Sequence, residues 1–214
     1  MKSLIPFYYL SALVIVLFSC NNGPADPIKS AKKENAERID SMINREQPVS
    51  SMAKLLSKKD ADFMVNAANG GMLEVQLGQL AQTNSRNQRV KDFGTMMIKD
   101  HSEGAQKLKE LAASKNITLP DAIGNRQQKE KERLQKKKGE AFDQAYIDLM
   151  VSDHKKDIRE FDQEATNGTN ETVKAFASSN LKMLHTHLDS AVSIQRVTSK
   201  KVSSGSSGPP PGLY

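Results

Sequence analysis

Two of the four histidines in the sequence lie in the same local context. The segments "MMIKDHSEGAQKL" (96–108) and "LMVSDHKKDIREF" (149–161) each have two apolar residues, two further positions and then Asp-His, about fifty residues apart. Each Asp-His opens a helical run in which the histidine falls on the apolar stripe, so His101 and His154 take positions that apolar residues usually fill. Imidazole at such positions either binds a transition metal or hydrogen-bonds inside the protein.

A carboxylate and a third imidazole are expected on the same buried side. In "DFMVNAANGGMLEVQLGQLAQ" (62–82), Glu74 shares the apolar stripe with Phe63 and Leu77. In "LKMLHTHL" (181–188), His185 and His187 are about 200° apart around a helix, so at most one can point squarely inward. Periodicity does not choose between these two histidines.

The four positions come from four separate helical segments, which suits a metal site built between facing helices. Carboxylate and neutral imidazole together are plausible ligands for zinc, iron, copper or manganese. Asp100 and Asp153 precede two of the histidines and can orient them from outside the ligand set, as can the histidine of the fourth segment that does not point inward. The alternative is that these aspartates are simply solvated on the helix surface, and for Asp100 we favour this alternative. The alternative to a metal site is a buried hydrogen-bond network without metal that fixes the register of the helices.

The region 58–199 must supply these helices, because it lacks the alternation of strands and is dense in helix-forming residues. Helices are expected from Ser57 or Asp60, over about 87–115, over about 139–165, and after 171. Short turns are expected to join these helices, except between the second and the third. There the chain has the basic segment "RQQKEKERLQKKKG" (126–139), which we expect to be a solvated connector. We therefore predict an all-α, up-down-up-down four-helix bundle. Gly70 and Gly71 would each cost about 1 kcal/mol in a helix, which indicates close approach of another backbone.

The two ends of the chain do not contribute to this core. Residues 1–19 have Lys2 and a short apolar run, which is typical of an export signal and shorter than a membrane span of about 20 residues. "LFSC" resembles the lipobox of bacterial lipoproteins, so Cys20 is predicted to be lipidated; an ordinary signal peptide is the alternative. Residues 20–57 are expected to form a polar, mostly disordered tether with at most a short exposed helix, and 200–214 a disordered tail.

Composition narrows the classes of function. The net charge is +6, but the basic segment has no aromatic residues to stack on bases, so nucleic acid is not an expected partner. The single cysteine excludes a disulfide within the chain and a thiolate cluster. The expected location is the cell envelope, on the periplasmic or outer-membrane side, with the membrane as partner through lipidated Cys20. No protein partner is indicated.

The blocks "VKDFGTMMIKDH", "LPDAI", "GEAFDQAYIDLMVSDHKKDIREF" and "VKAFASSNLKMLHTHL", together with 62–82, resemble the domain of unknown function 4142. This resemblance covers about 60–195 and implies an exported protein with a ferritin-like four-helix fold. Its recurring polar positions correspond to a set of residues that favours His187 over His185, namely Glu74, Asp100, His101, Asp153, His154 and His187.

The resemblance implies no established activity. The Glu-x-x-His pairs of ferritin-type di-iron centres are absent, because Ile98, Val151 and Leu184 stand three residues before the histidines. We expect a lipid-anchored envelope protein that binds a metal ion or small ligand through Glu74, His101, His154 and His187, and the sequence gives no clear indication of an enzyme. The second possibility is an envelope scaffold or interaction protein with a structural polar core. A metal-dependent oxidoreductase or hydrolase ranks third, because no nucleophile or acid-base pair is recognisable.

Overall fold

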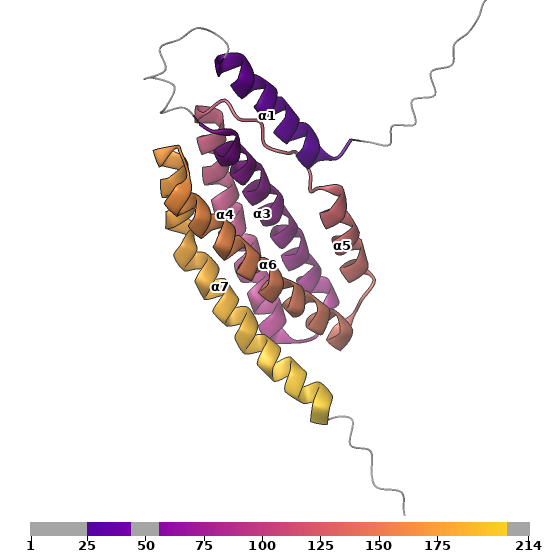
Figure 1. The fold of residues 1–214 in the computed structure, drawn as a ribbon. Helices are drawn as coiled ribbons and strands as arrows, with labels where there is room; N and C mark the ends of the chain where they lie inside the picture. The colour runs from indigo at the N-terminus through magenta and orange to yellow at the C-terminus, as the bar shows by residue number, and fades with distance from the viewer. Residues whose placement is uncertain (1–24, 44–55, 205–214) are drawn as a thin grey trace, which may run out of the picture.

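The computed structural model describes residues 25–43 and 56–204, and within these ranges the chain is all-helical. The predicted signal peptide and Cys20 lie outside the described residues. Four long helices lie side by side and two shorter ones flank them (Figure 1). The long helices are α3 (Lys58–Asn84), α4 (Gln88–Ser114), α6 (Gly139–Asn167) and α7 (Glu171–Ser204), and the shorter ones are α1 (Pro27–Ile43) and α5 (Asn125–Gln135).

Two tight turns fold the long helices into antiparallel hairpins, α3 with α4 and α6 with α7. The order of directions differs from the up-down-up-down arrangement that we predicted. Phe93 and Tyr146 lie near the starts of α4 and α6, and their ring centroids are 6.0 Å apart. These two helices therefore begin at the same end and run parallel, so the prediction of four alternating directions is wrong.

The reason is the basic segment between α4 and α6. It folds as α5 and carries the chain back along the outside of α3 before α6 begins (Figure 1). Leu134, which is fully buried, attaches this otherwise polar helix to the core. We did not predict this helix, because one buried apolar side chain gives only a weak periodic signal in such a charged sequence.

The start of α3 follows the capping rules. Ser57 is the N-cap of α3, its hydroxyl accepting from the backbone N–H of Asp60 at 3.1 Å. The Asp60 carboxylate accepts in return from the backbone N–H of Ser57 at 2.8 Å, which completes a capping box. The other Asp60 oxygen accepts from the backbone N–H of Thr169 at 2.8 Å. This carboxylate therefore joins the start of α3 to the turn that precedes α7.

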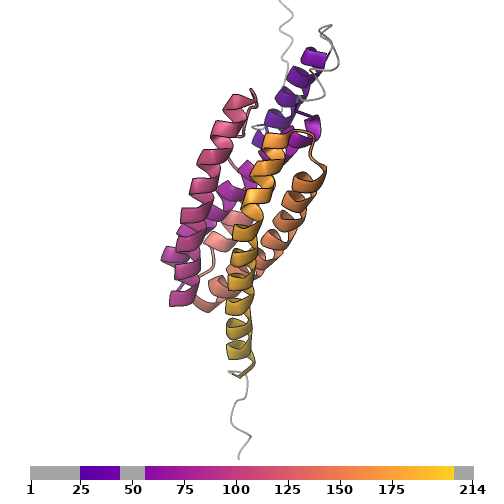
Figure 2. The same ribbon diagram turned by 90° about the vertical axis from the view of Figure 1, so that its left-hand side faces the viewer.

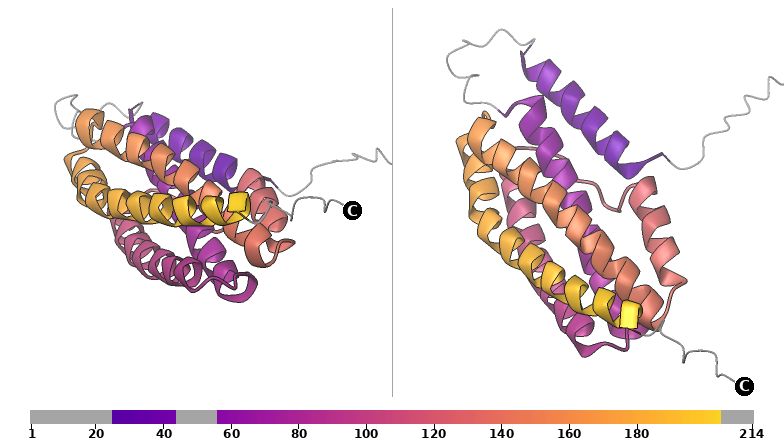
Figure 3. Two further views of the ribbon diagram at one scale, coloured as in Figure 1. Left: turned by 90° about the horizontal axis from the view of Figure 1, so that it is seen from below. Right: turned by 60° about the horizontal axis from the view of Figure 1, so that its bottom comes forward.

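The helix α1 is packed, contrary to the disordered tether that we expected over 20–57. Ala31, Asn35 and Ile39 are buried at spacings of four, and the helix contacts α3. The Asn35 side chain donates to the carbonyl oxygen of Thr118 and accepts from its backbone N–H, both at 2.9 Å. Seen from two further directions, α1 and α5 lie outside the four long helices, on the side of α3 and α6 (Figure 3). The prediction failed for 27–43 because a three-residue stripe and one paired amide suffice to attach a helix.

The core consists of two apolar clusters separated along the helix axes. One lies around Leu77, Phe93 and Phe142, and the other around Met64, Leu108 and Val173. Glu74, His101, His154 and His187 occupy the stretch of each helix that lies between these clusters. The buried polar residues are therefore enclosed by apolar layers toward both ends of the bundle.

Close helix packing occurs about two turns away from where we expected it. A Cβ atom added to Gly78 would lie 2.6 Å from the carbonyl oxygen of Gly94, so these glycines allow α3 and α4 to touch. At Gly70 and Gly71 the nearest neighbours of an added Cβ would be at 3.9 Å, which is ordinary contact distance. No backbone of another helix approaches these two glycines closely; instead, they border a cavity.

The C-terminal part of α7 extends beyond the other long helices (Figure 2). Among the described residues, no helix is both long enough and apolar enough to cross a membrane.

Candidate functional site

The structure brings together one acidic side chain and three imidazoles, one from each long helix. Glu74 comes from α3, His101 from α4, His154 from α6 and His187 from α7, and all four are buried. His154 and His187 are fully enclosed, while Glu74 and His101 are 2% and 7% exposed. One ring nitrogen of each histidine lies within 4.8 Å of those of the other two. The inward faces of four helices thus converge on one point, as their periodicity predicted.

His154 and His187 are in direct contact. Nε2 of His154 lies 3.2 Å from Nδ1 of His187. The remaining nitrogen of His154, Nδ1, lies 2.9 Å from the carbonyl oxygen of Met150, one turn back on the same helix. The remaining nitrogen of His187, Nε2, lies 2.9 Å from Oδ2 of Asp100 on α4. A line of polar contacts therefore crosses from α6 through α7 to α4.

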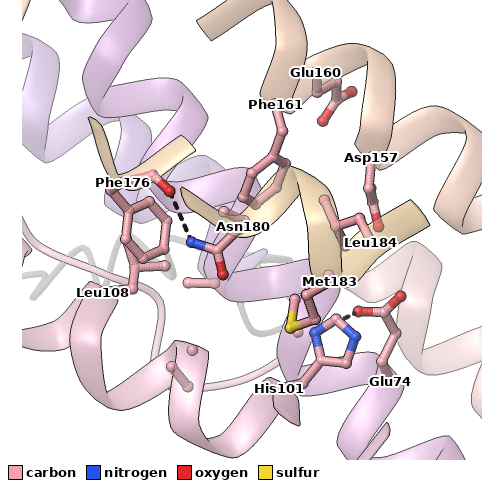
Figure 4. Close-up of a pocket in the computed structure, with 16 residues that line it drawn as sticks. Glu74, His101, Leu108, Asp157, Glu160, Phe161, Phe176, Asn180, Met183 and Leu184 are labelled. Carbon is pink, nitrogen blue, oxygen red and sulfur yellow. Dashed lines mark hydrogen bonds and ion pairs between the residues drawn. The ribbon is translucent and has the colours of Figure 1, made fainter. Parts of the chain in front are cut away.

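Glu74 lies beside the other histidine. Its Oε2 is 3.1 Å from Nδ1 of His101, and its Oε1 is 3.4 Å from Nδ1 of His154. The close-up of the cavity shows the carboxylate facing the His101 ring (Figure 4). Glu74 Oε1 and His101 Nε2 are both buried without a hydrogen-bond partner among the described residues. Such atoms are uncommon in folded proteins and indicate a bound group or a functional role.

The hydrogen-bond partners indicate which ring nitrogen of each histidine carries the proton. A carbonyl oxygen only accepts, so His154 donates from Nδ1 to Met150 and keeps a lone pair on Nε2 when it is neutral. In the same way, donation from His187 Nε2 to the Asp100 carboxylate leaves a lone pair on Nδ1. Donation from His101 Nδ1 to Glu74 leaves a lone pair on Nε2, the atom without a partner. Three neutral histidines assigned in this way present three free lone pairs.

Burial favours these neutral forms. Desolvation, together with repulsion from the nearby His187 ring, lowers the pKa of His154 to about 4. Desolvation also lowers the pKa of His101, with additional repulsion from His154 and His187. The pKa of His187 is lowered by desolvation, although the Asp100 carboxylate opposes this shift. All three rings are therefore biased toward the uncharged state that can bind a metal ion.

The carboxylates nearby are displaced in the opposite direction. Desolvation raises the pKa of Glu74, and the negative charges of Asp157 and Asp153 add to the effect. Desolvation likewise raises the pKa of Asp157 to about 7 and that of Asp153 to about 6. Acidic groups crowded in a poorly solvated space would gain from a nearby cation.

Of the three residues that we predicted to support the metal ligands, only Asp100 contacts the histidine cluster. Asp100 contacts His187 directly, as a group that orients a ligand would. Asp153 lines a pocket together with Glu74 and, within the part of the chain that the structure describes, makes no hydrogen bond or ion pair with a histidine. His185 is exposed and does not join the cluster, so the geometry agrees with the preference for His187.

Sequence reasoning missed two neighbours of the site. Asp157 lines both the pocket beside Asp153 and the cavity beside His101. Its position three residues after His154, on the same side of α6, was the available signal. Tyr146 is fully buried, and its hydroxyl has no hydrogen-bond partner among the described residues. Desolvation and the charge of Glu74 raise its pKa, which keeps the phenol protonated.

With this geometry established, comparison with known families is informative. Residues 45–194 match the model of one family, the Domain of unknown function (DUF4142). The chain belongs to this family. Comparisons with curated proteins and with solved structures found no match. DUF4142 membership accounts for the ordered blocks of sequence.

Proposed function

We propose that this DUF4142 protein binds one transition-metal ion through His101, His154 and His187. The contact between His154 Nε2 and His187 Nδ1 carries the proposal. Two neutral rings whose outer N–H groups are already engaged would direct two lone pairs at each other across 3.2 Å. That contact is repulsive unless a positive group lies between the lone pairs.

The separation suits a metal ion. Metal–nitrogen distances of about 2.0–2.1 Å in a tetrahedral zinc site imply a nitrogen–nitrogen separation of roughly 3.3 Å. Ligating histidines usually donate their second N–H to a carboxylate or a backbone carbonyl. Here His101 faces Glu74, His154 faces Met150 O and His187 faces Asp100. Three histidines would leave a fourth position open to solvent or a small ligand, as in sites where metal-bound molecules exchange.

In this arrangement Glu74 has a role that differs from the direct ligation we expected. Its Oε2 orients His101 and favours the tautomer with a free Nε2. Its second oxygen, Oε1, has no hydrogen-bond partner, and Glu74 borders the cavity beside His101. We propose that Glu74 supports the site from outside the three nitrogen ligands and faces the path to it.

We also propose a ferritin-like fold for the four long helices. A single long crossover between the second and third long helices, here containing α5, is the connection found in ferritin-like bundles. The metal chemistry would differ from that of di-iron members, because among the residues that the structure describes Glu74 is the one carboxylate buried beside the three histidines.

The proposed setting is the cell envelope, with the protein held at the membrane by lipid on Cys20. The motif "LFSC" and the apolar run before it support this setting. A lipid anchor would keep a metal-binding bundle at a membrane surface, where it could capture or buffer an ion.

Elemental analysis of the full-length protein, purified without an affinity tag, tests the proposal. We expect one metal ion per chain, and loss of that ion in the His187→Ala variant. His185→Ala is the matched control, because His185 is exposed on the same helix two residues away. Adding the ion to metal-free protein should raise the melting temperature, since an ion at 100 times its Kd stabilises the folded state by about 2.7 kcal/mol. The proposal would be refuted if wild-type protein contained no metal and if its melting temperature did not change on addition of zinc, copper, manganese or iron.

The second candidate is a structural polar core without metal, and the contact of Asp100 with His187 favours it. If His187 carries a proton on both nitrogens, it can donate to Asp100 and to His154 Nε2 at once. The lone pairs then no longer conflict, and the protein would act as an envelope scaffold. In that case the ion leaves stability unchanged, and His187→Ala destabilises the protein with or without metal.

A further inference from the structure

A pocket of about 320 Å³ lies between the start of α1 and helices α3, α5 and α6. Its lining contains six acidic residues and three basic ones. The acidic residues are Asp26, Glu74, Glu130, Asp153, Asp157 and Glu160, and the basic ones are Lys29, Arg126 and Lys156. A protein with a net charge of +6 thus carries a locally acidic pocket beside its histidine cluster.

The acidic pocket adjoins a second, smaller space next to the histidines. This inner cavity, of about 40 Å³, is bordered by Glu74 and His101 (Figure 4). Gly70, Glu74, Asp157 and Glu160 line both spaces, so the pocket and the cavity meet at these residues. A volume of about 10–15 Å³ is enough for one water molecule, so the inner cavity has room for an ion with a few waters.

The glycines keep this junction open. A Cβ added to Gly70 would lie 3.9 Å from Asp157 Oδ2, and one added to Gly71 would lie 3.9 Å from His101 Nδ1. Neither position is crowded, so packing does not require glycine there. Each glycine nevertheless costs about 1 kcal/mol of helix stability compared with alanine. The missing side chains leave space where the two cavities join.

Glu74 gives this path a buried oxygen atom that is free to bind a cation. It is 2% exposed, its Oε1 has no hydrogen-bond partner, and the residue borders both spaces. A hard oxygen ligand at this junction can replace water on a cation that is losing its hydration shell. The next available ligand would be a nitrogen lone pair of the histidine cluster.

We propose that the acidic pocket is the access route by which a divalent cation reaches the histidine site, passing Asp157 and Glu160, the gap at Gly70 and Gly71, and Glu74. This inference rests on the proposed metal binding. Carboxylates along a narrow path raise the local concentration of cations and can increase association rates by about 10- to 1,000-fold. The route residues should therefore affect how fast metal enters more than how much is finally bound.

The test measures uptake of Co²⁺ by the metal-free, full-length protein in a stopped-flow instrument, followed by visible absorption. The Asp157→Asn/Glu160→Gln variant should take up Co²⁺ about tenfold more slowly at 10 mM salt, where charges act over roughly 30 Å. At 0.5 M salt this difference should shrink, because salt screens the carboxylates. Final stoichiometry should equal that of wild type. Asp92→Asn/Glu103→Gln, which makes the same two kinds of substitution at exposed positions on α4, is the matched control and should load like wild type.

A second variant separates the gap from the charge. Gly70→Val fills the junction without changing any charge, so it should slow uptake at both salt concentrations and keep the salt dependence of wild type. Uptake by the double variant at the wild-type rate and with the wild-type salt dependence would overturn the route. An unchanged association rate with faster dissociation would also overturn it, because the residues would then be ligands. If wild-type protein takes up no Co²⁺ or other divalent ion, the proposed function itself fails.

Discussion

Asp100 on α4 accepts a hydrogen bond of 2.9 Å from Nε2 of His187 on α7. This contact joins two long helices and fixes which nitrogen of His187 faces the other histidines. Because Nε2 is engaged by a carboxylate, Nδ1 is left to face His154. A residue at the edge of the cluster, 27% exposed in its side chain, thus determines the chemistry at its centre.

Replacing Asp100 should therefore weaken metal binding without removing a ligand. We expect Asp100→Ala to lower the affinity for the ion about 10- to 100-fold, as is typical when the partner of a ligating histidine is lost. Competition with a chelator of known affinity would measure the change. Asp92→Ala, an exposed aspartate on the same helix, should bind the ion as tightly as wild type. Equal affinities for the Asp100 and Asp92 variants would show that His187 is not oriented in this way.

Two glycines on α3 should respond in opposite directions to the same substitution. Gly78→Ala places a Cβ 2.6 Å from the carbonyl oxygen of Gly94, so α3 and α4 must separate, at about 1–3 kcal/mol. Gly71→Ala places its Cβ 3.9 Å from His101 Nδ1, which is an ordinary contact distance, and should stabilise the helix by up to about 1 kcal/mol. Urea unfolding of the metal-free variants measures both changes. Destabilisation by both substitutions would mean that the junction at Gly71 is more crowded than described.

The sequence predicted the four long helices and the inward direction of Glu74, His101 and His154, because a period of 3.6 residues determines which side chains share a helix face. The cap of α3 was also readable, since Ser57 and Asp60 act through local backbone geometry. The direction of α6 was not readable. It depends on how α5 docks, and Leu134 is a single apolar residue in a charged segment.

The site was predictable in its members and less so in their roles. Periodicity could not choose between His185 and His187, and only the family resemblance favoured the residue that is buried. The contact of Asp100 with His187 joins positions 87 residues apart, so no local pattern could reveal it. The same holds for Asp157, whose importance arises from the two cavities that meet beside it.

Glu164, at the other end of the bundle from α5, should make stability depend on pH. Its pKa is raised from 4.5 to about 7, first by desolvation and then by its hydrogen bond with Asp60 and the negative charge of that carboxylate. Between about pH 4.5 and 7 the folded state therefore holds a proton that the unfolded state has released. The free energy of unfolding must fall as pH rises through this window, as far as this group is concerned.

Glu164→Gln should remove that dependence, because the amide can donate to Asp60 at any pH. The variant should gain stability over wild type above pH 7 and differ little from it near pH 4.5. Urea titrations at several pH values would measure the effect. Glu110→Gln, at an exposed position on α4, should follow the wild-type profile. A Glu164→Gln profile that runs parallel to wild type would mean that Glu164 titrates normally.

The attachment of α1 should depend mainly on Asn35. This side chain is 1% exposed and pairs with both backbone groups of Thr118, and its loss would leave those groups without their partner. Each buried group that loses its partner costs about 1–3 kcal/mol, which is comparable with the contribution from burying an Ile side chain such as that of Ile39. We expect Asn35→Ala to increase proteolysis and hydrogen exchange within 27–43 while the long helices stay protected. Lys33→Ala, at an exposed position on the same helix, should remain as protected as wild type. Equal protection of α1 in both variants would show that apolar contacts with α3 hold this helix without the amide.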